Sequence, residues 1–303
     1  MKRSRLRAVL GLALLAFALL PRAANAEFSI GDNLSSYTGV NAKGYMEPLK
    51  NALGSALNSG LYSSGHVARA GFGFRLELRG MLVSFSDDDK TFDAKTEDYF
   101  PTQTTAPAST VVGSVDAVTV QDPGTGATFA FPGGLELDRF ALAAPQLVVG
   151  SVMGTEGILR YFAIDTGDTD IGNITLFGLG VRHSLSQYLP AFPVNLSALL
   201  FFQSLEIGDK LIDASAFTLG VQASKRYALF EPYAGLSLDS FKMDVQYDTD
   251  VSGQNETLKI EFDRDTNPHL TLGSALHLGF FHLNGELNLA DQTGFTFGLG
   301  LGL

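Results

Sequence analysis

Residues 295–303 read Phe-Thr-Phe-Gly-Leu-Gly-Leu-Gly-Leu, a strict alternation of large apolar residues with threonine or glycine. Because successive side chains of a β-strand point to opposite faces, this stretch predicts a strand with one wholly apolar face and one face nearly without side chains. The same period of two recurs in residues 281–289, 270–278, 217–224 and 72–79. The pattern therefore indicates an all-β protein.

The number and length of the alternating runs favour a closed barrel over a soluble sandwich, which also alternates. We predict about ten strands, several of them long enough for a tilted strand to cross a bilayer. They cover residues 68–85, 141–153, 157–165, 172–185, 194–207, 211–226, 230–248, 268–280, 281–290 and 294–303. The expected fold is a closed antiparallel transmembrane β-barrel that occupies residues 67–303.

The connections between these strands differ in length on the two sides of the barrel, which is typical of bacterial outer-membrane barrels. Long outer loops are expected at residues 86–140, 166–171, 208–210, 249–267 and 291–293. Short inner turns are expected at 154–156, 186–193, 227–229 and Phe280-Phe281. In loop 86–140, β-rich runs flank Asp122-Pro-Gly-Thr-Gly. They predict a hairpin within the loop or, alternatively, two more spanning strands and a twelve-stranded barrel.

The first 26 residues have the features of a secretory signal peptide. A basic stretch precedes an uncharged apolar run from Ala8 to Leu20, and Ala24-Asn25-Ala26 is a small-x-small cleavage site. The run is short for a spanning helix, and no later segment approaches eighteen continuous apolar residues. We expect export to the outer membrane of a Gram-negative-type bacterium, with outer-membrane lipid and the barrel-assembly machinery as partners.

Composition excludes several classes of function. Five of the 21 basic residues and none of the 32 acidic ones lie in residues 1–26, which leaves a net charge near −16. A chain this acidic is not expected to bind nucleic acid. The absence of cysteine excludes disulfides, thiol catalysis and thiolate metal sites. The mean hydropathy is +0.14 although the apolar residues do not form runs, which suits strands with one apolar face.

Aromatic residues gather near the expected inner turns. The chain has no tryptophan, so phenylalanine and tyrosine would form the girdle that lies at the membrane interface of such barrels. The alternative is that these are ordinary core aromatics. The candidates are Tyr188, Phe192, Tyr227, Phe230, Tyr233, Phe280 and Phe281.

The N-terminal segment 27–66 predicts a short amphipathic helix between Gly44 and Gly60. Pro48 suits a first helical turn, and Asn58 to Gly60 suits a helix stop. A helix that presents one apolar stripe would bury it as a plug in the barrel lumen, against the inner membrane face, or under the barrel mouth. The plug residues would be Tyr45, Met46, Leu49, Leu53, Leu57 and Tyr62.

The runs Gly44-Tyr-Met-Glu-Pro-Leu and Leu57-Asn-Ser-Gly-Leu-Tyr62, with an alternating Gly/Phe strand soon after, resemble an uncharacterised family of bacterial outer-membrane barrels. In layout the chain is more distantly similar to the long-chain fatty-acid outer-membrane transporters. That resemblance implies an N-terminal plug inside a barrel. The specific part covers residues 40–80, and the barrel expected here has fewer strands than those transporters, so the likeness is one of fold.

Polar residues on the inward faces of the strands would fill the lumen with a charge network. The candidates are Arg75, Glu77, Arg79, Lys242, Asp244, His277, His282 and Glu286. A cluster of His277, His282 and Glu286 could bind a metal or act as a base. No serine in fixed register completes a hydrolase triad, so we expect no enzyme activity and no cofactor. Leu199 and Phe201 also face inward, which suits a small hydrophobic ligand. His183 faces outward.

The outer loops are acidic, and Asp165, Asp168 and Asp170 form a weak candidate for a calcium site. Three functions stay open. The first and favoured one is passage or binding of small, hydrophobic molecules, gated by the N-terminal segment. The second is a closed structural or adhesive barrel that acts through its acidic outer loops. The third is an outer-membrane enzyme, which would need a site centred on the histidines.

Overall fold

The computed structural model describes residues 33, 34, 37, 39–97, 100–165, 172–189, 191–208, 211–251 and 254–302, with the backbone alone for 248–251 and 254–256. The predicted signal peptide lies outside these residues. Within the described part, no helix is long and apolar enough to span a membrane.

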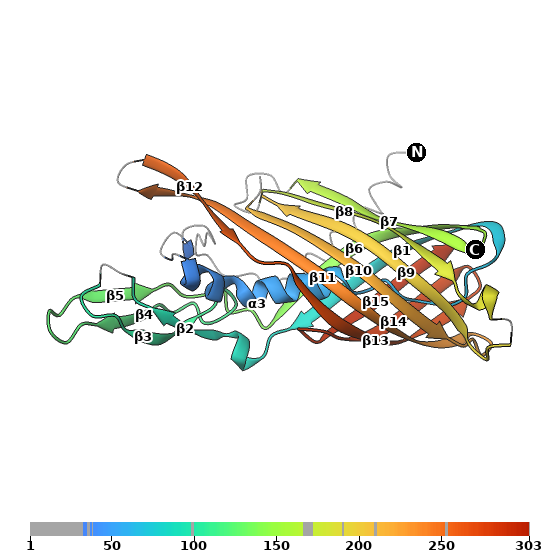
Figure 1. Ribbon diagram of the computed structural model, residues 1–303, viewed down its shortest axis with the longest axis horizontal. Helices are drawn as coiled ribbons and strands as arrows, with labels where there is room; N and C mark the ends of the chain where they lie inside the picture. Colours follow the sequence, from blue (N-terminus) through green and yellow to red (C-terminus); the bar gives the residue numbers. More distant parts are fainter. Residues whose placement is uncertain are drawn as a thin grey trace.

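Among the described residues, ten antiparallel strands close into a barrel (Figure 1). β1 pairs with both β6 and β15, and the pairing of β10 with β11 completes the ring. The ten strands are β1 (Ala70–Ser84), β6 (Arg139–Val152), β7 (Thr155–Asp165), β8 (Asn173–Ser184), β9 (Asn195–Ile207), β10 (Ile212–Ser224), β11 (Phe230–Val251), β13 (Asp265–Leu278), β14 (Phe281–Leu289) and β15 (Gly294–Gly302). The prediction of a ten-stranded barrel is confirmed.

The twelve-stranded alternative is wrong, because the strands of loop 86–140 pair outside the ring. β2 (Thr91–Lys95) pairs with β3 (Thr105–Ser109), and β4 (Val118–Gln121) pairs with β5 (Thr128–Phe131). These hairpins lie beyond one end of the barrel, which we call the outer end (Figure 1). The opposite, inner end carries the turn that precedes Phe281. A 3₁₀ turn, η1 (Asp87–Asp89), follows β1, and another, η2 (Ser186–Tyr188), follows β8.

Strand β11 is longer than the sequence pattern predicts. Its 22 residues continue past the ring and pair with β12 (Gln254–Glu261), an added strand outside the barrel. The predicted outer loop 249–267 therefore contains strand β12 and the start of β13.

The helix α3 (Gly39–Leu57) extends from the outer hairpins into the barrel (Figure 1). It starts before the predicted Gly44, so Pro48 lies in the middle of the helix and the expectation of a first-turn proline is wrong. A proline inside a helix costs about 3 kcal/mol. Burial outweighs that cost, because every residue of α3 from Pro48 to Leu57 is buried or half-buried.

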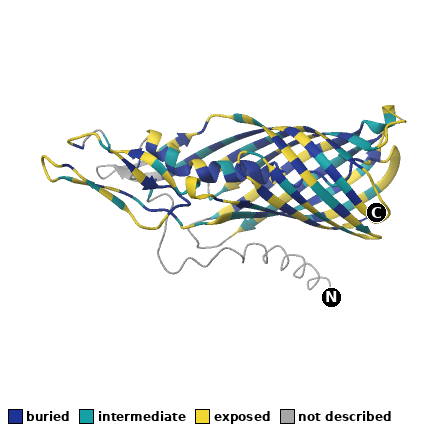
Figure 2. Ribbon diagram, turned by 90° about the horizontal axis from the view of Figure 1, so that it is seen from below, coloured by how far each residue is buried: buried dark blue, intermediate teal, exposed yellow. Residues whose placement is uncertain are grey.

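The environment of the two strand faces reverses along the barrel axis, as β11 shows. Toward the inner end, Leu236 and Leu238 are exposed on the outside, while Ser237 and Asp239 are buried inside. From residue 241 to residue 247, apolar side chains point inward and polar ones outward. The inward residues there are Phe241, Met243, Val245 and Tyr247. The exposed apolar belt therefore covers the inner part of the barrel, where yellow and blue squares alternate in Figure 2.

The apolar interior of the outer part forms one core with α3 and the hairpins, which we call the outer core. Tyr37, Tyr45 and Phe131 are fully buried there, and the Tyr45 hydroxyl donates to the Gly133 carbonyl at 3.0 Å. The ring of Tyr37 lies 5.3 Å from that of Tyr45. Burial raises the pKa of Tyr45 to about 12. The outer end of the barrel is thus filled by a core like that of a soluble domain.

Candidate functional site

Residues 39–66, the plug segment, extend from the outer hairpins into the lumen and pack against the barrel wall (Figure 1). α3 occupies the outer part, and the chain from Asn58 onward continues through the inner part until β1 begins at Ala70. The side chains expected to form a plug are all buried: Tyr45, Met46, Leu49, Leu53, Leu57 and Tyr62.

A barrel arginine holds the end of the plug helix. The last carbonyls of a helix have no partners within it. Arg160 on β7 donates from Nη1 to the Leu57 carbonyl at 3.2 Å and from Nη2 to the Gly60 carbonyl at 2.7 Å. Its Nη2 also reaches the Ser59 carbonyl at 2.9 Å, and the Gln203 side chain donates to Leu57 as well. The guanidinium group, fully buried, thus neutralises the negative end of the helix.

Further wall side chains hold the segment that follows. Arg79 Nη1 donates to the Tyr62 carbonyl at 3.3 Å, and Gln222 Nε2 donates to the Ser64 carbonyl at 2.8 Å. In these hydrogen bonds the donor is a wall side chain and the acceptor is a backbone carbonyl of the plug segment. If the plug moved away, water could accept the same hydrogen bonds from the wall.

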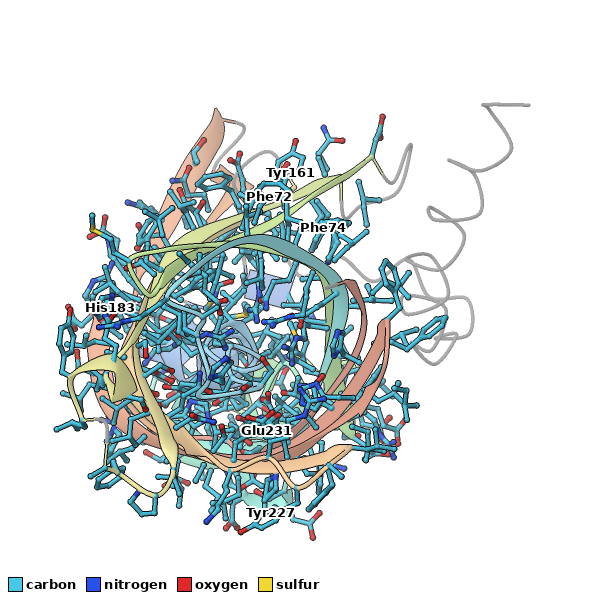
Figure 3. The ribbon with its side chains drawn as sticks, turned by 90° about the vertical axis from the view of Figure 1, so that its right-hand side faces the viewer. Phe72, Phe74, Tyr161, His183, Tyr227 and Glu231 are labelled. Atoms are coloured by element: carbon cyan, nitrogen blue, oxygen red, sulfur yellow. The ribbon has the colours of Figure 1, made fainter. Side chains whose placement is uncertain are left out.

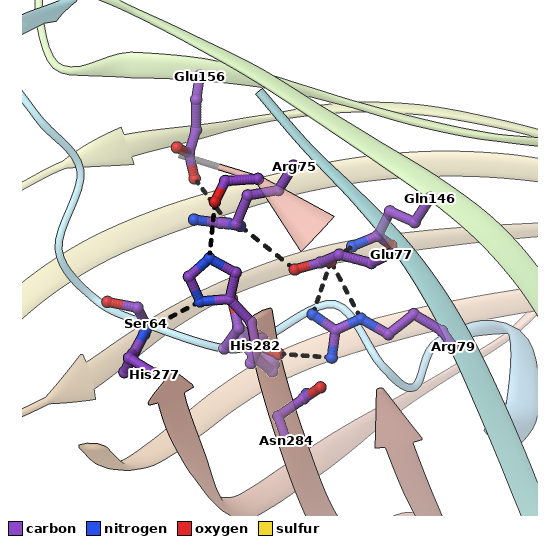
Figure 4. A network of polar contacts seen from close by, with 12 residues as sticks. Ser64, Arg75, Glu77, Arg79, Gln146, Glu156, His277, His282 and Asn284 are labelled. Carbon is purple, nitrogen blue, oxygen red and sulfur yellow. Dashed lines mark hydrogen bonds and ion pairs between the residues drawn. The ribbon is translucent and has the colours of Figure 1, made fainter. Parts of the chain in front are cut away.

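The charge of Arg79 is balanced inside the wall. Its guanidinium lies 2.9 Å from the Glu77 carboxylate (Figure 4). It also lies 3.5 Å from the carboxylate of Glu286. Glu77 also accepts from Gln146 Nε2 at 3.0 Å, and Glu286 accepts from the Tyr233 hydroxyl at 2.9 Å. A buried charge is tolerated only when it is paired and hydrogen-bonded, and this network gives the buried Arg79 guanidinium two carboxylate partners.

Glycines on the wall make room for Tyr62. A methyl group on Gly235 would lie 2.7 Å from the Tyr62 ring, and Gly220 faces the hydroxyl of the same side chain. Tyr62 and Leu61 share a small apolar cluster with Leu199 and Phe201. The plug therefore covers the apolar surface that the sequence suggested for a hydrophobic ligand.

The inner part of the lumen contains a chamber of about 610 Å³ at the barrel mouth. The polar and charged side chains that line it are Ser64, His66, Arg75, Ser151, Glu156, Asn195, Arg226, Glu231, His277 and His282. Ala68, Phe72, Phe74, Val148 and three glycines complete the lining and make much of its surface apolar. Figure 3 looks into this end, with Glu231 inside the ring. Arg75 lies 3.3 Å from Glu77 and 4.0 Å from Glu156. Glu156 also pairs with Arg182.

Two histidines face each other at this chamber. His277 on β13 and His282 on β14 are direct partners across the strand pair, and their Nδ1 atoms lie 3.1 Å apart (Figure 4). His277 Nε2 lies 2.8 Å from a carboxylate oxygen of Glu231, on β11. Sequence reasoning proposed Glu286 as the carboxylate of this cluster. Glu286 instead belongs to the Arg79 network, because its strand position lies deeper in the lumen.

Of the predicted lumen residues, six lie inside the barrel: Arg75, Glu77, Arg79, His277, His282 and Glu286. Lys242 and Asp244 do not, so their assignment to the lumen is wrong. They lie on the outward face of β11, where Lys242 Nζ is 3.1 Å from Asp244 and Lys259 is 3.3 Å from it. The apolar belt covers only the inner part of the barrel and ends before residue 242 of β11. Polar residues can therefore lie on the outer surface there.

The aromatic residues near the inner end divide in the same way. Six of the predicted girdle residues are exposed on the outside: Tyr188, Phe192, Tyr227, Phe230, Phe280 and Phe281. Tyr227 is seen outside the ring in Figure 3. Tyr233 is 5% exposed and points into the lumen toward Glu286, so its assignment to the girdle is wrong. His183 lies on the outer surface, with Nε2 3.1 Å from the Tyr188 hydroxyl.

Sequence reasoning missed several lumen residues, including Arg160, Arg182, Gln146 and Glu231. Each lies within a predicted strand and on its inward face, so the alternation was sufficient to place these side chains in the lumen. The alternation did not predict which residues they contact there. Of the weak calcium candidate, Asp165 ends β7, and Asp168 and Asp170 lie outside the described residues.

A family model matches residues 1–303 in full, and its description is "family of unknown function (DUF6588)". The chain belongs to this family. The resemblance to an uncharacterised family is thereby confirmed. No match was found among curated proteins.

Among solved structures, the chain is similar to a loop-deletion mutant of OmpT, an outer membrane protein of Vibrio cholerae. The identity is 13%, the TM-score is 0.28, and the match covers 78% of this chain and 100% of that one. It is also similar to the Ralstonia pickettii toluene transporter TbuX, at 8% identity and a TM-score of 0.26, covering 91% and 97%. The closed barrel rests on the strand pairing itself rather than on these distant likenesses.

Proposed function

We propose that this DUF6588 protein is an outer-membrane barrel that binds small solutes in its inner chamber and passes them when the plug segment moves. The belt of exposed apolar side chains supports a membrane location, since such a belt in a soluble protein would aggregate. The chamber would then open toward the periplasm.

One observation carries the gating proposal. In the inner lumen, the plug is held through hydrogen bonds from wall donors such as Arg160, Arg79 and Gln222 to its backbone carbonyls. Wall residues of this kind would line a hydrated passage if the segment moved away. The lining charges have both signs, and the apolar surface of Leu199 and Phe201 is covered by the plug. The solute we propose is therefore small and carries polar groups that these charges can bind, and we assign no catalytic role.

A second candidate, a closed barrel that acts through its outer loops, is favoured by the outer core. There α3 packs with β2–β5 into an apolar cluster outside the apolar belt. A plug segment held by this outer core would keep the lumen closed. Its role would be to support the β2–β3 and β4–β5 hairpins outside the membrane.

A reversible cross-link between plug and wall tests the two candidates. A Cβ placed on Gly54 of α3 would lie 3.3 Å from the Cβ of Phe241 on β11. This is close to the separation of about 3.8 Å in disulfides. The chain has no cysteine, so the double variant Gly54→Cys/Phe241→Cys would contain one thiol pair. Flux of small solutes into liposomes would be measured before and after reduction of the disulfide. The measurement would be made on the double-cysteine variant and on the same variant that also carries Arg160→Gln.

Flux that appears on reduction and is lost on oxidation would support gating. Equal flux in both states would overturn it, and the absence of flux in every form would favour the closed barrel. The double variant Thr119→Cys/Ala130→Cys is the matched control. These two residues are paired and exposed in the β4–β5 hairpin, so their disulfide does not connect plug to wall.

A further inference from the structure

The two chamber histidines have an unusual hydrogen-bonding arrangement. Each ring has an acceptor for Nε2: the Glu231 carboxylate at 2.8 Å for His277, and the Gly302 carbonyl at 3.3 Å for His282. The two Nδ1 atoms then face each other at 3.1 Å, with the ring planes at 80°.

Counting protons shows what this arrangement requires. A neutral imidazole has one N–H and one unprotonated nitrogen. If both rings donate from Nε2, both Nδ1 atoms present lone pairs to each other. If one ring donates from Nδ1 instead, its Nε2 lone pair faces an oxygen. All the contacts are satisfied together only when a cation, either a proton or a metal ion, lies between the two Nδ1 atoms.

We propose that His277 and His282 bind a transition-metal cation of the Zn²⁺ type through their Nδ1 atoms. Two nitrogens bound to one ion at 2.0–2.1 Å are separated by about 2.9–3.4 Å for angles between a right angle and the tetrahedral angle. The 3.1 Å separation falls within this range. The contacts of Nε2 with a carboxylate and a carbonyl are those that orient metal-binding histidines in other proteins.

Glu231 is itself held in place. Its Oε1 accepts from the Ser64 and Ser224 hydroxyls, each at 2.6 Å, while Oε2 faces His277. Ser64 belongs to the plug segment, so the outer shell of the proposed site includes the plug. The pair is therefore oriented before any ion arrives, which reduces the entropy cost of binding.

The protein would supply two ligands. Among the described residues, no three His, Cys, Asp or Glu side chains are placed to hold one ion. The other coordination positions would face the chamber, where water or a donor group of a solute could fill them. Imidazole ligands favour zinc, copper and nickel over magnesium or calcium. Both ligands lie on barrel strands, β13 and β14, so binding of the ion does not require the plug to move.

The test is Zn²⁺ binding to the detergent-folded protein, purified with a tag that contains no histidine. Calorimetry should show one ion bound at the pair, and both His277→Gln and His282→Gln should abolish that binding. Glu231→Gln, which alters the outer shell alone, should weaken it by about 10-fold or more. His183→Gln is the matched control, because His183 lies outside the barrel against Thr155 and Tyr188.

A second measurement needs no variant. Cu²⁺ bound to the wild-type protein should give an electron paramagnetic resonance spectrum with coupling to two imidazole nitrogens. The proposal is overturned if the wild-type protein binds neither ion, if the spectrum shows no nitrogen ligands, or if folded His277→Gln and His282→Gln proteins bind Zn²⁺ as the wild type does. Folding of each variant is checked by its heat-modifiable mobility.

Discussion

The Nη2 atom of Arg160 lies 2.7 Å from the carbonyl oxygen of Gly60, so a side chain of the barrel wall holds the turn that ends the plug helix. Gly60 has a φ of +71°, a conformation that suits glycine after a helix. The same guanidinium group lies over the Phe201 ring, 5.4 Å from its centre. This charged group therefore contacts both the plug and an aromatic side chain of the wall.

Arg160→Gln should loosen the plug without opening the barrel. Loss of charge-assisted hydrogen bonds costs about 1.5–3 kcal/mol, so the Asn58 and Ser59 amides should exchange their hydrogens about 10–100 times faster. Hydrogen exchange followed by mass spectrometry measures this. Arg264→Gln is the control, because Arg264 bonds to Ser215 and Ser240 on the outside. Unchanged exchange in the Arg160 variant would contradict the role of this arginine.

Gly235→Ala should disturb the plug through Tyr62. The added methyl would lie 2.7 Å from the ring, so ring or strand must shift, at a cost of about 1–3 kcal/mol. Thermal unfolding, followed by heat-modifiable mobility, should show a lower midpoint. Gly285→Ala has nothing within 4 Å and should leave the midpoint unchanged. Adding Tyr62→Leu to Gly235→Ala should restore stability. If it does not, the clash is not with Tyr62.

Leu236→Arg tests where the apolar belt lies. This residue is 56% exposed on the outside of β11, within the belt. An arginine near the middle of a bilayer lowers barrel stability by about 2–4 kcal/mol. Urea titration of the protein in lipid vesicles should show that loss. Gln246→Arg, on the same face of the same strand beyond the belt, should cost little. Equal losses at both positions would contradict the reversal of the strand faces near residue 240.

The outer core should lose stability at alkaline pH through Tyr45. Its pKa in the folded protein is about 12, above the ordinary value of 10.0, so the folded state disfavours the phenolate. A raised pKa means that the contribution is complete below pH 10 and is lost as the pH rises toward 12. A difference of two units corresponds to about 3 kcal/mol. Protease cleavage within residues 86–140 should increase over this window.

Tyr45→Phe should make that dependence shallower, because it removes one titrating group. The same change removes the hydrogen bond to Gly133, so the variant should be less stable by about 1 kcal/mol at neutral pH. A variant with the wild-type alkaline profile would assign the dependence to other groups, such as Tyr37, whose pKa burial also raises.

The period of two in residues such as 295–303 was sufficient to predict the ten strands of the ring, because alternation follows from strand geometry alone. It did not decide whether residues 86–140 add two more strands, and it did not predict β12. The stripe of Tyr45, Leu49, Leu53 and Leu57 likewise predicted a helix that must be buried. These are local properties, and the barrel, the inner aromatic residues and the presence of a helix followed from them.

Tertiary structure decided which environment each face meets. Periodicity shows that Lys242 and Asp244 share a face with Leu236 and Leu238, but it does not show that the surroundings change between them. Tyr233 shares the inward face with Phe241 and packs at a different height in the lumen. Pairings such as Arg160 with Gly60, or Glu231 with His277, join residues 100 and 46 positions apart. Sequence separation of this size carries no local signal, so only closure of the barrel around the plug brings these groups together.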